Sequence, residues 1–228
     1  MLHVVIAEAE VEPVPASIAG HPVIRREARR RRRRATQMLL DASRHHAAMR
    51  SLSNAARRGR PDIAHYTLLV LLESPLNRQG LLRCYLHTRN DEVVFINPET
   101  RLPRACERFR GLMEKLFAER RIAAGDKTLL ELRRMSLLQL VEQLSPKRVV
   151  LLSERGRRME SWELAEELSR HGEACILIGG FPHGDFKGEY PFERVSIFQE
   201  PLAAWSAASE VVSQYRRCIE NAQAQPQT

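Results

Sequence analysis

The stretch ILIGGFPHGDFKGEY, residues 176–190, carries the strongest indication of the fold. It begins as a hydrophobic strand, breaks at Gly179 and Gly180, and continues through Pro, His, Gly and Asp before the next apolar segment. Glycine has no Cβ, so a ligand can approach its backbone closely. In open α/β sheets, ligands bind beyond the carboxyl ends of the strands. The pattern therefore favours a ligand site, with a glycine turn that merely leaves a strand as the alternative.

Short apolar runs alternate with amphipathic stretches along the chain. The expected strands are residues 2–7, 66–72, 81–86, 93–96, 149–152, 174–178 and 195–198. The expected helices are residues 25–40, 45–56, 106–121, 129–144, 161–171 and 202–218. This alternation is typical of an α/β fold with a mainly parallel sheet and helices on both faces. Two strand-like runs flank Asn90 and Asp91, which predicts an added antiparallel hairpin near 81–98.

The expected domain organisation is a single domain over residues 1–220, since 228 residues with 43% hydrophobic content can bury one substantial core. A basic helical insertion is expected near residues 25–60. The polar ending AQAQPQT places a disordered tail at 221–228. No apolar run is long enough to span a bilayer, and the N-terminus lacks the features of a signal peptide, so no membrane association is expected.

Charge content indicates the class of partner, and cysteine content indicates the redox environment and the absence of a zinc-finger pattern. Thirty-six Lys and Arg against 28 Asp and Glu give a formal charge of +8. Such an excess favours a polyanion, because neutralised phosphates release counterions, although a basic solvated surface is the alternative. The cysteines are widely separated and lack zinc-finger spacing. Reduced thiols of a cytoplasmic protein, without a metal site, are therefore expected.

Three strand endings in the last third of the chain predict one pocket. They are RVVLLSERG (148–156), EACILIGG (173–180) and RVSIFQEPL (194–202). Pro201 opens the last expected helix, whose free N–H groups can receive polar atoms. Neither the GxGxxG nor the GxxxxGK[ST] pattern is present, which argues against a Rossmann dinucleotide or a nucleoside triphosphate.

Arginines gather at two other places. In RRGRPDI (57–63), Arg58 and Arg60 lie beside a Pro-stiffened turn, and Asp62 is close enough in sequence to orient one guanidinium. The planar guanidinium suits phosphates and base edges, so both arginines are candidates for RNA contact, while a salt-bridged turn is the alternative. The tract RREARRRRRR (25–34) places arginines on every face of a helix. A solvated, partly disordered arm and a phosphate-binding surface are both consistent with it.

The chain resembles a known family over nearly its whole length. The matching segments are SRHHAAM (43–49), RRGRPDIAHYTLL (57–69), ESPLN (73–77), INPETRLPR (96–104), RFRGLMEKL (108–116), IGGFPHGDF (178–186) and PLAAWSAASEV (201–211). Together they resemble the nucleolar essential protein family, ribosome-assembly methyltransferases of the SPOUT superfamily. The resemblance implies a homodimer with a C-terminal trefoil knot that binds S-adenosylmethionine. It also implies methylation of ring nitrogen N1 of a pseudouridine in small-subunit ribosomal RNA, with ribosomal proteins as further partners in assembly.

The resemblance also assigns site residues. Those expected to bind the cofactor are Leu152, Gly179, Gly180, Phe181, Gly184, Ile197, Phe198, Pro201 and Leu202. Those expected to bind RNA are Arg60, Arg101, Arg104 and Arg108, with Arg58 added for its charge beside the turn. Arg60 and Asp62 are the expected catalytic residues, and His183 is expected to shape its loop. The proton acceptor stays open between Asp62, Glu73 and water.

Two other functions remain open from the residues. The first is an RNA-binding assembly factor that acts mainly by docking, which the basic surface supports and which does not exclude catalysis. The second is an α/β enzyme that does not act on RNA and whose positive charge is incidental.

Overall fold

The computed structural model describes residues 1–224, and these form one eight-stranded sheet in the order β4-β5-β3-β2-β1-β7-β6-β8. The strands are β1 (Leu2–Ala9), β2 (Leu82–Thr88), β3 (Glu92–Ile96), β4 (Arg121–Ala124), β5 (Lys127–Arg134), β6 (Arg148–Arg158), β7 (Ala174–Gly179) and β8 (Glu193–Ser196). The pairs β1–β2, β1–β7, β6–β7 and β6–β8 are parallel, whereas β2–β3, β3–β5 and β4–β5 are antiparallel. The predicted parallel core with an added hairpin is confirmed.

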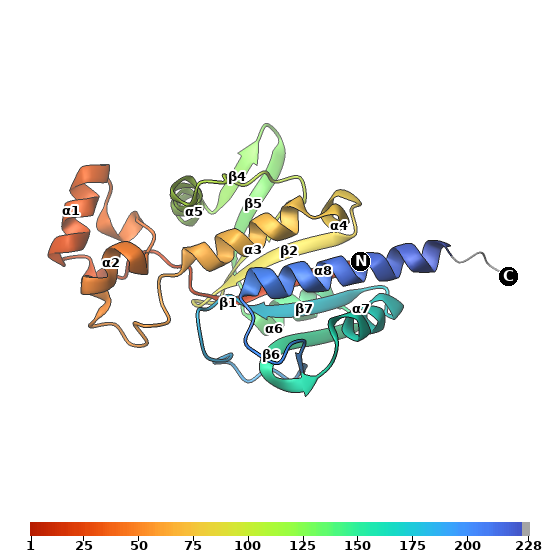
Figure 1. Ribbon diagram of the computed structural model, residues 1–228. Helices are drawn as coiled ribbons and strands as arrows, with labels where there is room; N and C mark the ends of the chain where they lie inside the picture. The colour runs from red at the N-terminus through yellow and green to blue at the C-terminus, as the bar shows by residue number, and fades with distance from the viewer. Residues whose placement is uncertain (225–228) are drawn as a thin grey trace.

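Helices cover both faces of the sheet (Figure 1). They are α1 (Pro22–Arg31), α2 (Ala42–Met49), α3 (Pro61–Glu73), α4 (Pro75–Arg78), α5 (Cys106–Glu119), α6 (Leu137–Leu144), α7 (Ser161–Arg170) and α8 (Ala204–Ala224). The larger hydrophobic core packs α3, α5, α7 and α8 against one face, and a second core packs α6 against the other. Every residue of β1 is buried, as expected of a central strand covered on both sides.

The expected strand at residues 66–72 is wrong, because this segment lies inside α3. Pro61 occupies the first turn of that helix, where a missing N–H costs nothing. The remainder of α3 packs between the sheet, α5 and α8, so its apolar residues surround most of the helix. An apolar run without a polar face hides the helical period, which explains the misassignment.

The expected helix at residues 129–144 is also wrong in its first half. Residues up to Arg134 form β5, and α6 begins only after Ser136. The Ser136 hydroxyl accepts from the Gln139 backbone N–H while the Gln139 side chain accepts from the Ser136 N–H, a capping box that fixes the start of α6. The short, largely exposed edge strand β4 was not predicted.

The basic insertion forms a small helical unit with its own core, and Figure 1 shows α1 and α2 projecting from one end of the sheet. Helix α1 is shorter than predicted, because Arg32 adopts a left-handed conformation with φ of 50° and ends it. At the other end of the chain, residues 221–224 continue α8 in place of the expected disorder. Residues 225–228 of the predicted tail lie outside the described residues.

The implied trefoil knot stays a prediction, because strand order and pairing do not define how the chain threads through its own loops. Within residues 1–224, no helix is both long enough and apolar enough to cross a membrane.

Candidate cofactor cavity and basic surface

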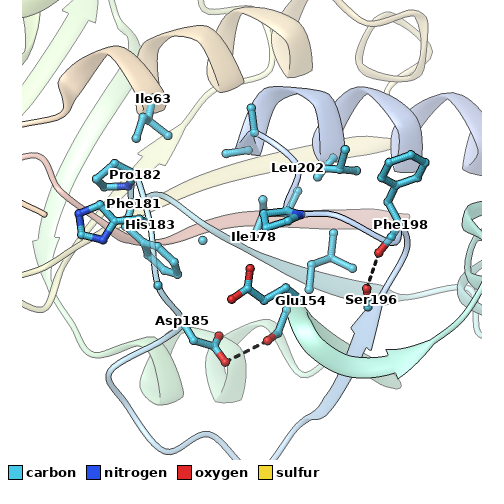
Figure 2. A pocket seen from close by; sticks show the side chains of 18 of the residues that line it. Ile63, Glu154, Ile178, Phe181, Pro182, His183, Asp185, Ser196, Phe198 and Leu202 are labelled. Carbon is cyan, nitrogen blue, oxygen red and sulfur yellow. Dashed lines mark hydrogen bonds between the residues drawn. The ribbon is translucent and has the colours of Figure 1, made fainter.

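A cavity of about 430 Å³ lies beside the middle of β6 and beyond the ends of the parallel strands β7 and β8 (Figure 2). Leu152, Ser153 and Glu154 line it from the irregular middle of β6, the loops after β7 and β8 supply much of the remaining wall, and the first turns of α3 and α8 close it from above. The volume falls within the roughly 300–1,000 Å³ typical of small-molecule sites. The cavity therefore occupies the position that parallel α/β sheets use for ligands.

Eight of the nine expected cofactor residues line this cavity. They are Leu152, Gly179, Phe181, Gly184, Ile197, Phe198, Pro201 and Leu202. At Gly179, a Cβ would lie 2.5 Å from Cζ of the Phe181 ring, which folds back over its backbone, so a larger residue would displace this ring. Gly184 has a φ of 79°, a conformation that favours glycine.

Gly180 has a different role from the one expected. It does not line the cavity, and a Cβ at this position would lie 2.7 Å from Cα of Ala9 and 2.9 Å from Cγ2 of Ile6. Its N–H donates to Ala7 O at 2.8 Å, and its carbonyl accepts from Glu10 N at 3.1 Å. The second glycine therefore allows the loop to pack directly on β1.

Several polar and apolar residues of the cavity were not predicted. They include Ile63, Ser153, Glu154, Ile178, Asp185 and Trp205. Asp185 is already engaged, since it accepts from Ser153 Oγ at 3.0 Å and pairs with Arg194 at 2.8 Å. Glu154 points into the cavity in Figure 2 and has no hydrogen-bond or ion-pair partner among the described residues. Glu154 lies two residues after the expected strand 149–152, and this position is the signal that could have identified it.

Three buried carboxylates at and beyond the end of β1 hold the turn 56–60 in place. Arg57 donates to Glu8 Oε2 at 2.8 Å and to Glu10 Oε1 at 3.0 Å. Arg58 makes a two-point pair with Glu12, with both distances 2.7 Å. Glu10 also pairs with Arg89. Because these carboxylates are at least 90% buried, each needs its guanidinium partner, and removing one partner would leave a costly unpaired charge.

The same network fixes the loop that borders the cavity. The Arg57 guanidinium carbon lies 3.7 Å from the centroid of the Phe181 ring, and its Nη1 donates to Asp185 O at 2.6 Å. His183 Nε2 lies 3.2 Å from Ala56 O, consistent with its expected role in shaping the loop. Arg57 therefore joins β1 to two residues of the cavity wall.

The Glu8 carboxylate holds residues 187–190, at the far end of this loop, through hydrogen bonds. Its carboxylate accepts from the backbone N–H groups of Lys187 and Gly188 and from the Tyr190 hydroxyl at 3.0 Å. Burial, together with the neighbouring Glu8 carboxylate, raises the pKa of Tyr190, so its phenol stays protonated and able to donate.

Arg60 and Asp62 form the pair expected from sequence. Arg60 Nε and Nη2 donate to the two carboxylate oxygens of Asp62 at 2.9 and 2.7 Å, and Arg60 also lines the cavity. The hydrogen bond to Asp62 raises the pKa of Arg60, which keeps this cation permanently charged. Asp62 does not line the cavity, so the structure places it as the group that orients Arg60.

The other expected RNA residues divide into two groups. Arg101, Arg104 and Arg108 are exposed just before and within the first turn of α5. Arg58, in contrast, is buried against Glu12 and presents no free guanidinium to a partner. We therefore place Arg58 in the framework of the protein and leave it out of the candidate RNA surface.

Glu73 lies at the wrong end of α3 to act in the cavity. The first turn of α3 contributes Ile63 to the cavity wall, whereas Glu73 ends the helix about 15 Å further along its axis and pairs with Arg78 at 3.1 Å. This position places Glu73 away from the cavity of its own chain. Within residues 1–224, no group of three His, Cys, Asp or Glu residues is arranged to hold a metal ion.

These features define an α/β protein with a small-molecule cavity at the carboxyl ends of its strands and an arginine surface beside it. The EMG1/NEP1 methyltransferase family model matches residues 4–216. The chain therefore belongs to the EMG1/NEP1 methyltransferase family, and the resemblance seen in its sequence motifs is confirmed.

Individual relatives are similar over nearly their full length. The ribosomal RNA small subunit methyltransferase Nep1 of Thermococcus kodakarensis is 45% identical over 219 residues, which cover 96% of this chain and 99% of the relative. The Pyrococcus furiosus protein of the same name is 44% identical, with 94% and 96% covered. A crystal structure of Archaeoglobus fulgidus Nep1 bound to S-adenosylhomocysteine has a TM-score of 0.85 and 44% identity, with 96% and 98% covered.

We predict that Gly180→Ala destabilises the fold by roughly 1–3 kcal/mol, because the added methyl overlaps the backbone of β1. Urea denaturation of the ligand-free protein measures this change. Gly111→Ala is the matched control, since a Cβ there meets nothing within 4 Å and alanine favours a helix. If Gly180→Ala kept its stability but lost ligand binding, Gly180 would instead be part of the cavity wall.

We predict that Arg57→Ala weakens S-adenosylhomocysteine binding by roughly tenfold, equivalent to about 1.4 kcal/mol, because Phe181 and Asp185 lose the contact that fixes them. Calorimetric titration of folded protein gives the affinity. Arg58→Ala is the control, because it also breaks a buried ion pair but does not touch this loop. Equal losses of affinity in the two variants would show that general destabilisation is responsible.

Proposed function

We propose that this protein transfers a methyl group from S-adenosylmethionine to small-subunit ribosomal RNA, at ring nitrogen N1 of a pseudouridine. The cavity beside the middle of β6 and the ends of β7 and β8 carries this proposal. Two findings support it: relatives named as small-subunit rRNA methyltransferases and a similar structure bound to S-adenosylhomocysteine. The pseudouridine specificity rests on the family resemblance of the sequence motifs.

The cavity suits a nucleoside ligand with an amino-acid arm. Leu152, Ile178, Ile197 and Leu202 supply apolar walls, while Ser153, Glu154 and Ser196 supply polar groups. Apolar walls with a few oriented polar groups are typical of cofactor sites. Bound S-adenosylmethionine would supply an electrophilic methyl group, so the protein needs no covalent nucleophile.

The residues around the cavity then act by alignment and by exclusion of water. Arg60, held by Asp62, lies at the rim where a target nucleotide would enter, and it can bind a phosphate or a base edge. Arg101, Arg104 and Arg108 add exposed positive charge for the RNA backbone. Aligning an extruded base with the methyl group supplies much of the catalysis, because correct orientation replaces a bimolecular encounter.

A homodimer is proposed as the working form. Tyr66, Phe198 and Leu202 are exposed large hydrophobic side chains, and Phe198 and Leu202 lie at the cavity itself. Trp205 packs edge-on against Tyr66 at a centroid distance of 5.5 Å, so the patch is continuous between α3 and α8. Covering such a patch with a second copy would shield both the apolar surface and the cofactor.

A cytoplasmic location and contacts with ribosomal proteins follow from the proposed substrate. Docking without catalysis is the second candidate function, favoured by the exposed arginines of α1 and α5. The docking function requires only that the protein binds ribosomal RNA. Only chemistry on the base separates the two functions.

We predict methylation of a pseudouridine-containing rRNA stem-loop and none of the same stem-loop with uridine, because only pseudouridine has a free N1–H. Mass spectrometry of nucleosides after incubation with S-adenosylmethionine measures the product. An unmodified pseudouridine loop that nevertheless binds the protein would leave docking as the function.

We predict that Glu154→Gln weakens S-adenosylmethionine binding by roughly threefold while S-adenosylhomocysteine binding changes less. Glu154 points into the cavity without a partner among the described residues, and only the first ligand carries a sulfonium charge for it to attract. Paired titrations with the two ligands measure the difference. Equal effects on both ligands would assign Glu154 to a group that they share.

A further inference from the structure

Seven arginines in and after α1 are exposed and lie outside the site described above. They are Arg25, Arg26, Arg29, Arg30, Arg32, Arg33 and Arg34. Among the described residues, only Arg33 of these has an ion-pair partner, at 3.6 Å from Glu114. So many uncompensated cations on a short segment repel one another, which disfavours an ordered helix unless other contacts hold it.

The structure shows what holds this segment. Arg31 makes a two-point pair with Glu114 of α5, with both distances 2.7 Å, and the Glu114 side chain is fully buried. Glu114 also accepts from Leu39 N at 3.0 Å. Inside the unit, Ile24 and Ala28 pack into the small core that contains Met38 and Leu40. One arginine of the tract is therefore an anchor that fixes the exposed arginines in space.

Four of the exposed arginines surround one shallow hollow. Arg25, Arg29, Arg32 and Arg33 line a concavity of about 320 Å³ whose remaining wall is formed by Ala28 and Ala35. Arg25 and Arg29 share one side of α1 because they are four positions apart, and Arg32 follows as the left-handed residue that ends the helix. The small alanine floor leaves room between the guanidinium groups for an anion. A row of phosphates is the occupant that matches this charge and shape.

The hollow is linked to the candidate RNA surface through α5. Glu114 ties α1 to α5, and Glu107 near the start of α5 pairs with Arg44 of α2. Arg104 and Arg108 lie at that same end of α5. Figure 1 shows α1 and α2 at one end of the molecule, on the same side as α5. RNA held at Arg104 and Arg108 therefore lies next to the helical unit that carries the hollow.

We propose that the α1 hollow binds the phosphate backbone of ribosomal RNA outside the target loop, which extends the RNA contact beyond the methylation site. The proposal rests on the proposed function for its choice of RNA. Contacts to phosphates position a protein but do not read sequence. The hollow therefore orients the protein on a folded RNA, while the cavity and Arg60 select the base.

The test compares two triple variants that lose the same charge. The hollow variant carries Arg25→Gln, Arg29→Gln and Arg32→Gln. The control variant carries Arg78→Gln, Arg170→Gln and Arg217→Gln, three exposed arginines on α4, α7 and α8. Each protein is titrated with the pseudouridine stem-loop alone and with the same stem-loop extended by its flanking rRNA helices, over a series of salt concentrations. Calorimetric S-adenosylhomocysteine binding confirms that each variant is folded.

The hollow variant should bind the extended RNA roughly tenfold more weakly at moderate salt, and its log–log salt slope should fall in magnitude by about 2–3 relative to the control variant. Equal slopes in the two variants, with wild-type methylation intact, would overturn this proposal and leave the proposed function standing. Wild-type protein that neither binds nor methylates either RNA would overturn both. Reduced affinity for polyglutamate with unchanged RNA affinity would assign the hollow to an acidic protein partner instead, which also contradicts the proposal.

Discussion

The ion pairs between Arg57 and the carboxylates of Glu8 and Glu10 are the interaction on which the site depends. All three side chains are at least 90% buried, so the pairing is shielded from solvent and cannot be exchanged cheaply for hydration. The guanidinium joins the end of the central strand to Phe181 and to the Asp185 carbonyl. The cavity loop is thereby ordered before any ligand arrives, which lowers the entropic cost of binding.

This arrangement divides two tasks between Arg57 and Arg60, two arginines of the same turn. Arg57 faces the interior and shapes the cavity, whereas Arg60, three residues later, reaches the rim and is oriented by Asp62. A single short turn therefore borders both the proposed cofactor and the proposed RNA. Movement of this turn would disturb both ligands together, and the buried pairs of Arg57 and Arg58 oppose such movement.

The sequence pattern predicted elements and site residues correctly where the local pattern and the tertiary environment agree. The strand endings and Gly179 were located because buried parallel strands are short apolar runs that end in turn residues. It failed at Gly180 and Arg58, whose roles depend on contacts with residues about 170 and 46 positions away in the chain. It also failed at residues 66–72, where burial around most of the helix removes the period that identifies one. Charge alone could not show which arginines are paired inside the protein.

We propose that the methyl donor binds in the cavity between the middle of β6 and the loops after β7 and β8. A crystal structure of the protein soaked with S-adenosylhomocysteine tests it most directly. We expect ligand density enclosed by Phe181, Ile197 and Leu202, with Arg60 at the open side. Density for the ligand at any other place, with this cavity filled only by solvent, would contradict it.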